Sequence, residues 1–311
     1  MIVEVKNVLK RYDELTALDH FSIDVAEGEI YGLLGPNGSG KTTAIHCMLS
    51  LLKYEKGEIL LFGEPIGPTK YDLKRRIGVV PQEVSLMYEL TVQENIDFFC
   101  GLYVTDKTRR QKLVENAMEF VAIQEFRKFY PNKLSGGLKR RLNIACGIAH
   151  QPELIFFDEP TVAVDPQSRN NILEGIRRLN EEGATIIYTS HYMEEVEQLC
   201  NRISIMDKGR VLITGSKEEL KESVGLKDKL IVSQIDIAQD ALTEIQDMVE
   251  VSSVFYEGEE LTVNIDKNRA IGEVINYLDH QGMYYGKLSI KQPTLNDVFL
   301  EITGKELRQR V

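Results

Sequence analysis

Apolar residues recur along the first two-thirds of the chain in two patterns, one with the period of a strand and one with that of a helix. Short apolar runs predict buried strands at 30–34, 77–82, 154–157 and 185–190. Alternating apolar and polar residues predict half-buried strands at 1–9, as an edge strand, and at 21–25. A hairpin strand is expected at 57–63 and a hairpin over 201–215 that turns at Lys208-Gly209. Helical patterns lie at about 42–52, 91–99, 106–129, 135–150 and 166–180.

Buried strands that alternate with helices favour an α/β fold built on a parallel sheet. The stretch from about 83 to 150 departs from this alternation because it contains only helical patterns, and we expect a helical insert there. Thr91 and Glu94 have the spacing of a capping box, which predicts where the first helix of the insert begins.

The last third of the chain has a different organisation. A boundary is expected near 222–228, which divides the chain into domains at 1–221 and 222–311. Beyond it, strands are predicted at 229–235, 250–255, 260–265 and 288–291, and helices at 270–280 and 295–302. These elements predict a small α+β domain, and the sequence shows no internal repeat.

Composition and charge exclude some classes of protein. The net charge of −11 argues against general binding to nucleic acid, which requires a basic surface. The cysteines, Cys47, Cys100, Cys146 and Cys200, lie far apart without metal-site spacing, so we expect reduced thiols in a cytosolic protein. The N-terminus does not resemble a signal peptide, and no run of about 18 apolar residues predicts a membrane span.

A glycine-rich loop between the strand at 30–34 and the next helix is the strongest chemical signal. Its residues, Gly35, Pro36, Asn37, Gly38, Ser39, Gly40, Lys41, Thr42 and Thr43, fit the pattern G-x-x-x-x-G-K-[ST]. The glycines allow successive N–H groups to point at one anion, and the helix N-terminus adds partial positive charge. In such a P-loop, Lys41 would reach the β- and γ-phosphates and the Thr42 hydroxyl would hold Mg²⁺.

Polar residues follow three of the other predicted strands. Asp158 and Glu159 end the strand at 154–157, where a P-loop protein places its Mg²⁺-binding carboxylate. We expect Asp158 to bind the metal and Glu159 to act as a general base, with a solvated turn as the alternative. Gln82 ends the strand at 77–82. His191 follows the strand at 185–190, where it is either structural or close to a γ-phosphate.

Two further positions are ambiguous when each is considered alone. Tyr12 follows the first strand and could stack on a base, although a tyrosine there more often packs against the protein. Ser135, Gly136 and Gly137 begin a helix and form either an anion-binding nest or an ordinary N-cap.

Together and in this order, these residues resemble the nucleotide-binding domain of the ABC ATPase superfamily, over about residues 1–220. Tyr12 matches the adenine-stacking aromatic, Gly35–Thr43 the Walker A motif and Gln82 the Q-loop. Leu134–Gly137 match the signature motif, Leu154–Glu159 Walker B with the catalytic glutamate, and His191 the switch histidine. The resemblance implies a P-loop α/β fold with a mixed or parallel core sheet, an antiparallel β subdomain and an α-helical subdomain.

The resemblance also implies a mechanism. Two copies of the chain would dimerise head to tail around two ATP molecules, and Ser135, Gly136 and Gly137 of each copy would bind the ATP of the other. Thr42, Gln82 and Asp158 would hold Mg²⁺, Glu159 would polarise the attacking water, and His191 would steady the γ-phosphate. Two small departures, Leu138-Lys139 after the signature and the loop Val162-Ala163-Val164-Asp165, remove no group that this chemistry needs.

The C-terminal stretch Pro293–Gly304 resembles the end of ATPases that serve ABC-2 type permeases, such as antibiotic, drug and sodium exporters. This likeness implies separate permease partners and a peripheral position on the cytoplasmic face of the membrane. A permease helix would then dock near 82–99, with Met87, Tyr88, Leu90 and Phe98 as contacts. The cargo cannot be read from this chain, because the permease would contact it.

Two other classes of protein fit less well. The first class is the soluble ABC ATPases. Members that act on ribosomes carry two cassettes, whereas this chain has one P-loop. Members that act on DNA carry a long coiled coil between the Walker motifs, and the gap from Thr43 to Leu154 is too short for it. The second class is a P-loop GTPase or kinase of another family. A GTPase would need N-K-x-D, and the nearest match, Asn132-Lys133-Leu134-Ser135, lacks the aspartate.

Overall fold

The structure is a computed structural model, and it describes residues 1–162, 164–266 and 269–304. Within these residues the chain divides into two compact units, over 1–217 and over 218–304. None of the helices in the described ranges is long and apolar enough to cross a membrane.

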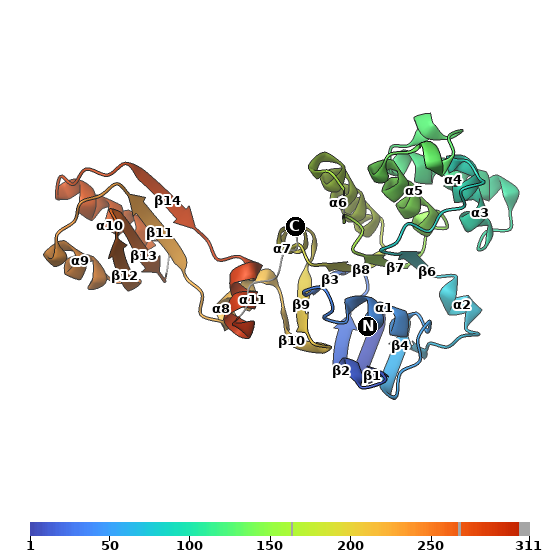
Figure 1. The fold of residues 1–311 in the computed structure, drawn as a ribbon, viewed down its shortest axis with the longest axis horizontal. Helices are drawn as coiled ribbons and strands as arrows, with labels where there is room; N and C mark the ends of the chain where they lie inside the picture. The colour runs from blue at the N-terminus through green and yellow to red at the C-terminus, as the bar shows by residue number, and fades with distance from the viewer. Residues whose placement is uncertain (163, 267–268, 305–311) are drawn as a thin grey trace. The chain divides into compact units, whose positions relative to one another are not determined.

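A six-stranded sheet forms the centre of the first unit, in the order β10-β9-β3-β8-β7-β6 (Figure 1). Its strands are β3 (Ile30–Leu34), β6 (Ile77–Val80), β7 (Leu154–Asp158), β8 (Thr185–Ser190), β9 (Arg202–Asp207) and β10 (Arg210–Gly215). Neighbours pair in parallel except β10, which returns antiparallel to β9 through the predicted turn at Lys208-Gly209. Strands β3, β7 and β8 are buried along their whole length, which explains their continuous apolar runs. The predicted α/β fold is confirmed.

A second, antiparallel sheet packs against the first through helix α1 (Lys41–Met48). Its strands are β1 (Val3–Tyr12), β2 (Leu15–Val25), β4 (Lys56–Leu61) and β5 (Glu64–Pro65), in the order β2-β1-β4-β5. One hydrophobic core joins Phe21 of β2, Ile45 and Met48 of α1, and Phe156 of β7. The prediction of an edge strand at 1–9 is wrong, because β1 pairs with both β2 and β4. Alternation reports which face of a strand is buried and contains no information about its backbone partners.

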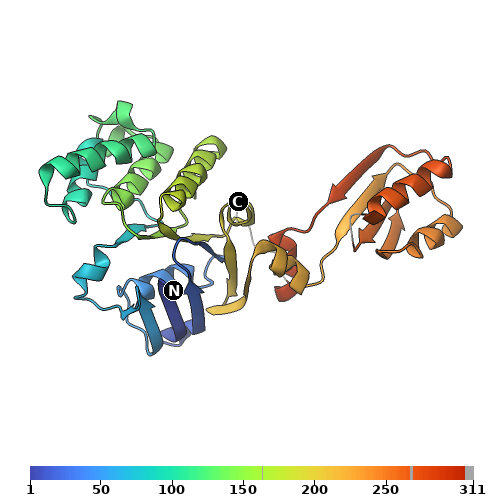
Figure 2. The same cartoon turned by 180° about the vertical axis from the view of Figure 1, so that it is seen from behind.

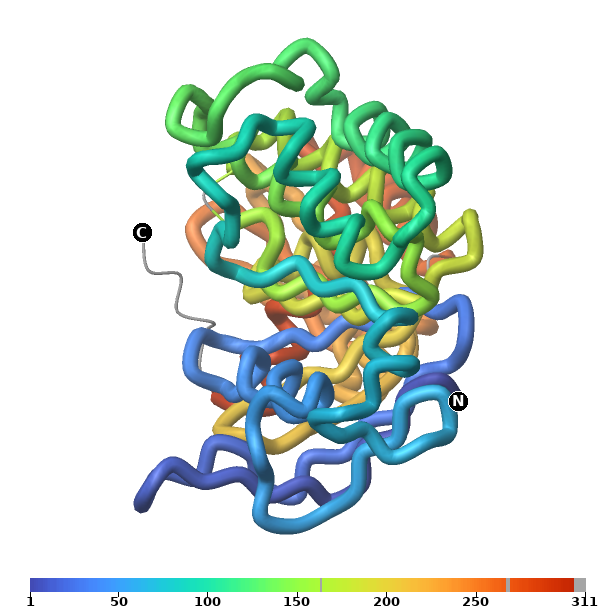
Figure 3. Tube along the Cα trace, turned by 90° about the vertical axis from the view of Figure 1, so that its right-hand side faces the viewer, coloured from blue at the N-terminus to red at the C-terminus, as the bar shows by residue number. Residues whose placement is uncertain are grey.

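The expected helical insert is present and consists of α3 (Val92–Gly101), α4 (Lys107–Phe120) and α5 (Gly136–Ile148). Figures 1 and 2 show these helices on the opposite side of the central sheet from the antiparallel sheet, and Figure 3 agrees. Thr91 forms the predicted capping box with Glu94. The helix predicted to continue to 129 ends at Phe120, because Ala122 adopts a left-handed φ of 52° and only short 3₁₀ turns follow. The short helix α2 (Tyr71–Lys74) was not predicted.

The second unit contains the predicted strands and helices on an antiparallel sheet in the order β12-β13-β11-β14. The strands are β11 (Asp228–Ser233), β12 (Val251–Glu257), β13 (Glu260–Ile265) and β14 (Lys287–Lys291), and its helices include α10 (Arg269–His280) and α11 (Leu295–Thr303). Leu230 and Val263 of the sheet share a core with Val274 of α10. Two helices were missed: α8 (Lys217–Ser223) and α9 (Gln239–Gln246).

Leu61→Ala tests the core between the two sheets of the first unit. Leu61 on β4 is fully buried, whereas Leu15 on β2 is 68% exposed. Truncating a buried leucine leaves a cavity, so we expect Leu61→Ala to lower the free energy of unfolding by about 2–5 kcal/mol. Leu15→Ala is the matched control and should have little effect. Urea denaturation followed by circular dichroism measures both, and equal losses in the two variants would contradict this description of the core.

Candidate functional site

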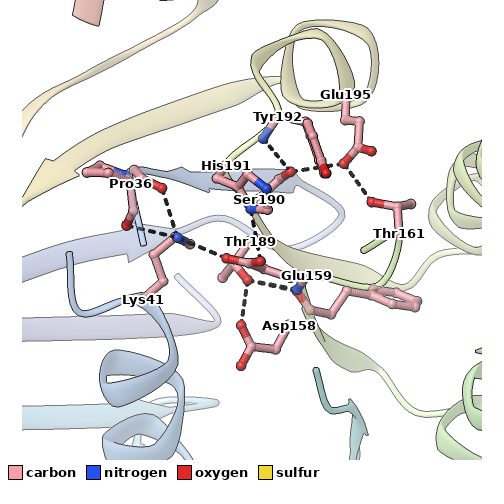
Figure 4. A network of polar contacts seen from close by, with 12 residues as sticks. Pro36, Lys41, Asp158, Glu159, Thr161, Thr189, Ser190, His191, Tyr192 and Glu195 are labelled. Carbon is pink, nitrogen blue, oxygen red and sulfur yellow. Dashed lines mark hydrogen bonds and ion pairs between the residues drawn. The ribbon is translucent and has the colours of Figure 1, made fainter. Parts of the chain in front are cut away.

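Parallel strand pairing brings the predicted site residues to one edge of the central sheet. Leu34 at the end of β3 pairs with Ser190 at the end of β8, and Asp158 at the end of β7 pairs with Thr189. The P-loop, the carboxylates and the histidine therefore leave the sheet side by side, as Figure 4 shows for Lys41, Glu159 and His191. Ligands of open α/β sheets bind at this carboxyl edge.

The P-loop has a backbone that only glycine can follow at several positions. Gly38 and Gly40 have φ values of 81° and 109°. A Cβ atom on Gly40 would lie 2.6 Å from the Ala17 carbonyl oxygen, and one on Gly35 would lie 2.4 Å from that of Met206. The loop therefore lies against neighbouring backbone at Gly35 and Gly40, and a residue with a side chain at either position would displace it.

The start of α1 fits an anionic group. Gly40 is the N-cap of α1 and offers no side chain to its first amides. Ser39 lies directly before it, and the buried hydroxyl of Ser39 has no hydrogen-bond partner among the described residues. Free N–H groups at a helix N-terminus and an unpartnered buried hydroxyl are the groups that a phosphate satisfies.

The ammonium of Lys41 lies at the centre of the site and is almost fully buried. It donates to the carbonyl oxygens of Gly35 at 2.8 Å and Pro36 at 3.3 Å, and it lies 3.0 Å from Oε1 of Glu159. Through Lys41, the first two residues of the loop are therefore connected to the carboxylate of Glu159 (Figure 4).

Thr189 of β8 forms hydrogen bonds with both acidic residues at the end of β7. Its hydroxyl donates to Oδ1 of Asp158 at 2.7 Å and accepts from the backbone N–H of Glu159 at 3.1 Å. Glu159 has a φ of 46°, a left-handed conformation that is uncommon for a residue with a side chain. The second carboxylate oxygen of Glu159, Oε2, lies 2.9 Å from Nδ1 of His191. Strained backbone held by buried hydrogen bonds is typical of functional sites.

The surroundings of Glu159 alter its pKa. Burial acts to raise that pKa, but the hydrogen bond with His191 and the charge of Lys41 outweigh it, so the pKa of Glu159 is lowered. The carboxylate is thus held in its charged form, which is the form that accepts a proton.

The other residues predicted to bind ATP or metal differ in their exposure to solvent. Thr42 and Thr43 are half-buried at the start of α1, and Gln82 is exposed just after β6. Tyr12 is 43% exposed at the end of β1, with the Lys10 ammonium 5.0 Å from the centre of its ring. An exposed aromatic ring at this position is available for stacking.

The signature residues are not brought to the P-loop within one chain. Ser135 is exposed, and its hydroxyl accepts from the backbone N–H of Leu138 at 3.3 Å as the N-cap of α5. Among the described residues, no hydrogen bond or ion pair connects 134–137 with 35–43. A Cβ atom on Gly136 would meet nothing within 4 Å, so the space around it is open. The loop expected at 162–165 includes Ala163, which lies outside the described residues.

Sequence reasoning missed four polar residues that support this site: Thr161, Arg169, Thr189 and Glu195. Thr189 and Glu195 are buried, and each contacts a residue from another segment of the chain. The available signal for Thr189 was its position near the end of an apolar strand, directly before Ser190 and His191. Glu195 gave no signal, because a glutamate in the first turn of a helix is common at exposed positions.

Glu159→Gln should change the way in which stability depends on pH. Because the folded pKa of Glu159 is lowered, its charged form stabilises the fold above the usual glutamate pKa of about 4.3, and this contribution is lost as the pH falls through the folded value. The free energy of unfolding of the wild type should therefore decline more steeply than that of Glu159→Gln below about pH 4.3. Denaturant titrations at several pH values measure this difference, and parallel curves would contradict the described environment.

Comparison with known proteins identifies relatives of this chain. Residues 18–162 match the family described as ABC transporter, and residues 215–303 match the C-terminal domain of ATP-binding proteins that are DrrA1-3-like. The chain is 37% identical over 310 residues to the linearmycin resistance ATP-binding protein LnrL of Bacillus subtilis (strain 168), covering 99% of this chain and 100% of the relative.

A second relative and a solved structure agree. The Nod factor export ATP-binding protein I of Burkholderia thailandensis is 35% identical over 309 residues, which cover 98% of each chain. The ATP-binding cassette MJ0796, solved as a dimer bound to ADP and Pi, superposes with a TM-score of 0.64 at 28% identity, covering 69% of this chain and 98% of its own. The chain therefore belongs to the ABC transporter family and is an ATP-binding, ATP-hydrolysing subunit.

Proposed function

We propose that this chain powers a membrane exporter of drug-like or antibiotic compounds that is formed with separate ABC-2 type permease subunits. The observation that carries the proposal is the match over nearly the whole chain, including 215–303, to relatives named for linearmycin resistance and Nod factor export. The C-terminal residues 293–304 resemble the same group of ATPases. The net charge of −11 agrees with a protein partner rather than a nucleic acid.

The P-loop residues are proposed to hold the phosphates of ATP, with Tyr12 against the base. The glycine backbone, the unpartnered Ser39 hydroxyl and the N-terminus of α1 supply the donors that this requires. A phosphate at this position would take the place of the Glu159 carboxylate at Lys41. Lys41 would then contact phosphate, and Oε1 of Glu159 would be freed while Oε2 keeps its contact with His191.

Thr42, Gln82 and Asp158 are proposed to hold Mg²⁺, which would neutralise charge on the β- and γ-phosphates. Their hydroxyl, amide and carboxylate oxygens are the ligands that Mg²⁺ prefers. Thr189 donates to Oδ1 of Asp158, so the orientation of this carboxylate is fixed by a neighbouring strand. In the described part of the chain, the other oxygen of Asp158 has no hydrogen-bond partner and remains available to a metal or its water.

Glu159 and His191 are proposed as the catalytic pair. Glu159 would accept a proton from the attacking water, which its charged state allows, and His191 would orient Glu159 and steady the γ-phosphate. The carboxylate and the imidazole are already in contact at 2.9 Å, so little rearrangement is needed to position them.

A second copy of the chain is proposed to complete the ATP site with Ser135, Gly136 and Gly137. These residues begin the 13-residue helix α5, lie at or near the surface, and have no hydrogen bond to the P-loop of their own chain within the described ranges. The N-terminus of such a helix attracts a phosphate. The related cassette MJ0796 was solved as a dimer, which supports this arrangement.

Glu159→Gln tests the proposed catalytic role. The amide cannot accept the proton from water, but it retains the size of the side chain. We therefore expect ATP binding and ATP-dependent dimerisation to persist while kcat falls by about 10²–10⁴-fold. A phosphate-release assay and size-exclusion chromatography with ATP measure the two effects. Turnover at the wild-type rate would rule out Glu159 as the base.

The permease is proposed to dock on an apolar surface that borders the helical insert. A pocket of about 360 Å³ there is lined by Leu51, Phe99, Leu102 and Tyr103. Leu51 is 64% exposed and Leu102 58% exposed. The contacts expected from sequence, Met87, Tyr88 and Phe98, are also exposed, and Leu90 is half-buried. Binding there would hold the chain on the cytoplasmic face of the membrane.

Leu102→Glu should weaken attachment to the permease because it places a charge on this apolar surface. The purified protein should keep its basal ATPase activity, while its recovery with membranes that contain its permease partner should fall. Leu212→Glu is the matched control, since Leu212 on β10 is also exposed, at 39%, and lies outside the pocket. Equal recovery of both variants with membranes would show that this surface is not the docking site. Recovery of the wild-type protein with ribosomes and not with membranes would overturn the proposed function.

A further inference from the structure

A buried carboxylate behind the catalytic pair is not used by the chemistry described above. Glu195 lies in α7 (Met193–Leu199), and its side chain is only 2% exposed. A buried carboxylate is costly unless donors and cations surround it, so its partners indicate what it does.

Three hydroxyl groups from separate positions converge on one oxygen of this carboxylate. Oε2 of Glu195 accepts hydrogen bonds from Thr161 at 2.8 Å, Tyr188 at 2.8 Å and Ser190 at 2.9 Å. Figure 4 shows Thr161 and Ser190 on either side of this carboxylate. Burial and the charge of Glu195 raise the pKa of Tyr188 well above its usual range, so the phenol remains a donor. One oxygen therefore joins the loop after β7 to the end of β8.

The other oxygen faces a cation from a third segment. Oε1 of Glu195 lies 3.2 Å from Nε of Arg169, on the first turns of α6 (Pro166–Glu181). Neither atom has a well-aligned hydrogen bond among the described residues, so the contact is mainly one of charge. The Arg169 guanidinium also lies 4.7 Å from the ring centre of Tyr192.

Two of these partners are next to the catalytic pair in the chain. Thr161 follows Glu159 by two residues, and Ser190 directly precedes His191. The Ser190 hydroxyl also accepts from the backbone N–H of Tyr192 at 2.9 Å, so the backbone is held on both sides of the histidine. The Tyr192 ring lies 4.1 Å from the His191 ring, centre to centre. Glu195 thus fixes the segment that carries the base relative to the segment that carries the histidine.

We infer that Glu195, with Arg169, is a positioning residue for ATP hydrolysis that holds Glu159 and His191 at their contact distance. This inference rests on the catalytic roles proposed above. The carboxylate acts through other residues and reaches neither oxygen of Glu159. Misplacement of reacting groups by about 1 Å can cost on the order of 100-fold in rate, so the effect should fall on kcat.

Glu195→Gln is the informative variant, because the amide oxygen can still accept the hydroxyl hydrogen bonds while the charge opposite Arg169 is lost. We expect kcat to fall by about 10- to 100-fold with an unchanged KM for ATP. The matched control is Glu194→Gln, since Glu194 is the exposed neighbour on the same helix, and it should retain wild-type kcat. Thermal unfolding of each variant separates this effect from loss of the fold.

Two further comparisons give results that a purely structural role would not produce. In a His191→Ala background, Glu195→Gln should have no additional effect on kcat, because the contact between Glu159 and His191 that Glu195 maintains is already absent. Arg169→Lys keeps the positive charge and should retain more of kcat than Arg169→Ala. This pair also replaces Glu195→Gln as the test if that variant does not fold.

The inference is overturned if Glu195→Gln turns over ATP at the wild-type rate, or if it lowers kcat by the same factor with and without His191. Normal turnover of Glu159→Gln would instead refute the catalytic role on which the inference rests. The two failures are therefore distinguishable in one set of assays.

Discussion

Parallel pairing of β3, β8 and β7 is the constraint on which the rest of the site depends. It aligns the end of β3 with the ends of β7 and β8, which lie more than one hundred residues later in the sequence, so that Lys41, Glu159 and His191 meet in one network. The strands are buried along their length and apolar in their middle, and polar groups gather at their carboxyl ends. The chemistry of the chain is therefore concentrated at one edge of the sheet.

At that edge of the sheet, the buried charges and the strained backbone of Glu159 are each stabilised by a neighbouring residue. Lys41 and Glu159 are both buried, and each would be costly alone, but each supplies the partner that the other needs. The left-handed backbone of Glu159 is held by Thr189 from the next strand. Glu195 is a second buried carboxylate that is stabilised by its neighbours, because hydroxyl donors and Arg169 from separate segments surround it.

The residues proposed to bind ATP are not all brought together within one chain. The P-loop and the carboxylates share one network, whereas the signature residues begin α5 in the helical insert and face outward. This separation is consistent with an enzyme whose activity depends on association, because the missing donors can be supplied by another copy. It also gives the helical insert two purposes, to carry the signature residues and to border the surface proposed for the permease.

The sequence alone determined the α/β fold, the order of nearly all strands and helices, and the P-loop, because apolar periodicity and glycine spacing are local properties. It did not determine that β1 lies inside its sheet or that the helix after residue 106 ends at Phe120, since backbone pairing and a left-handed turn depend on distant partners. Only the tertiary structure showed that Thr189 orients Asp158 and that Glu195 joins three segments. Buried polar networks are set by contacts between residues far apart in the chain, and no local pattern records those contacts.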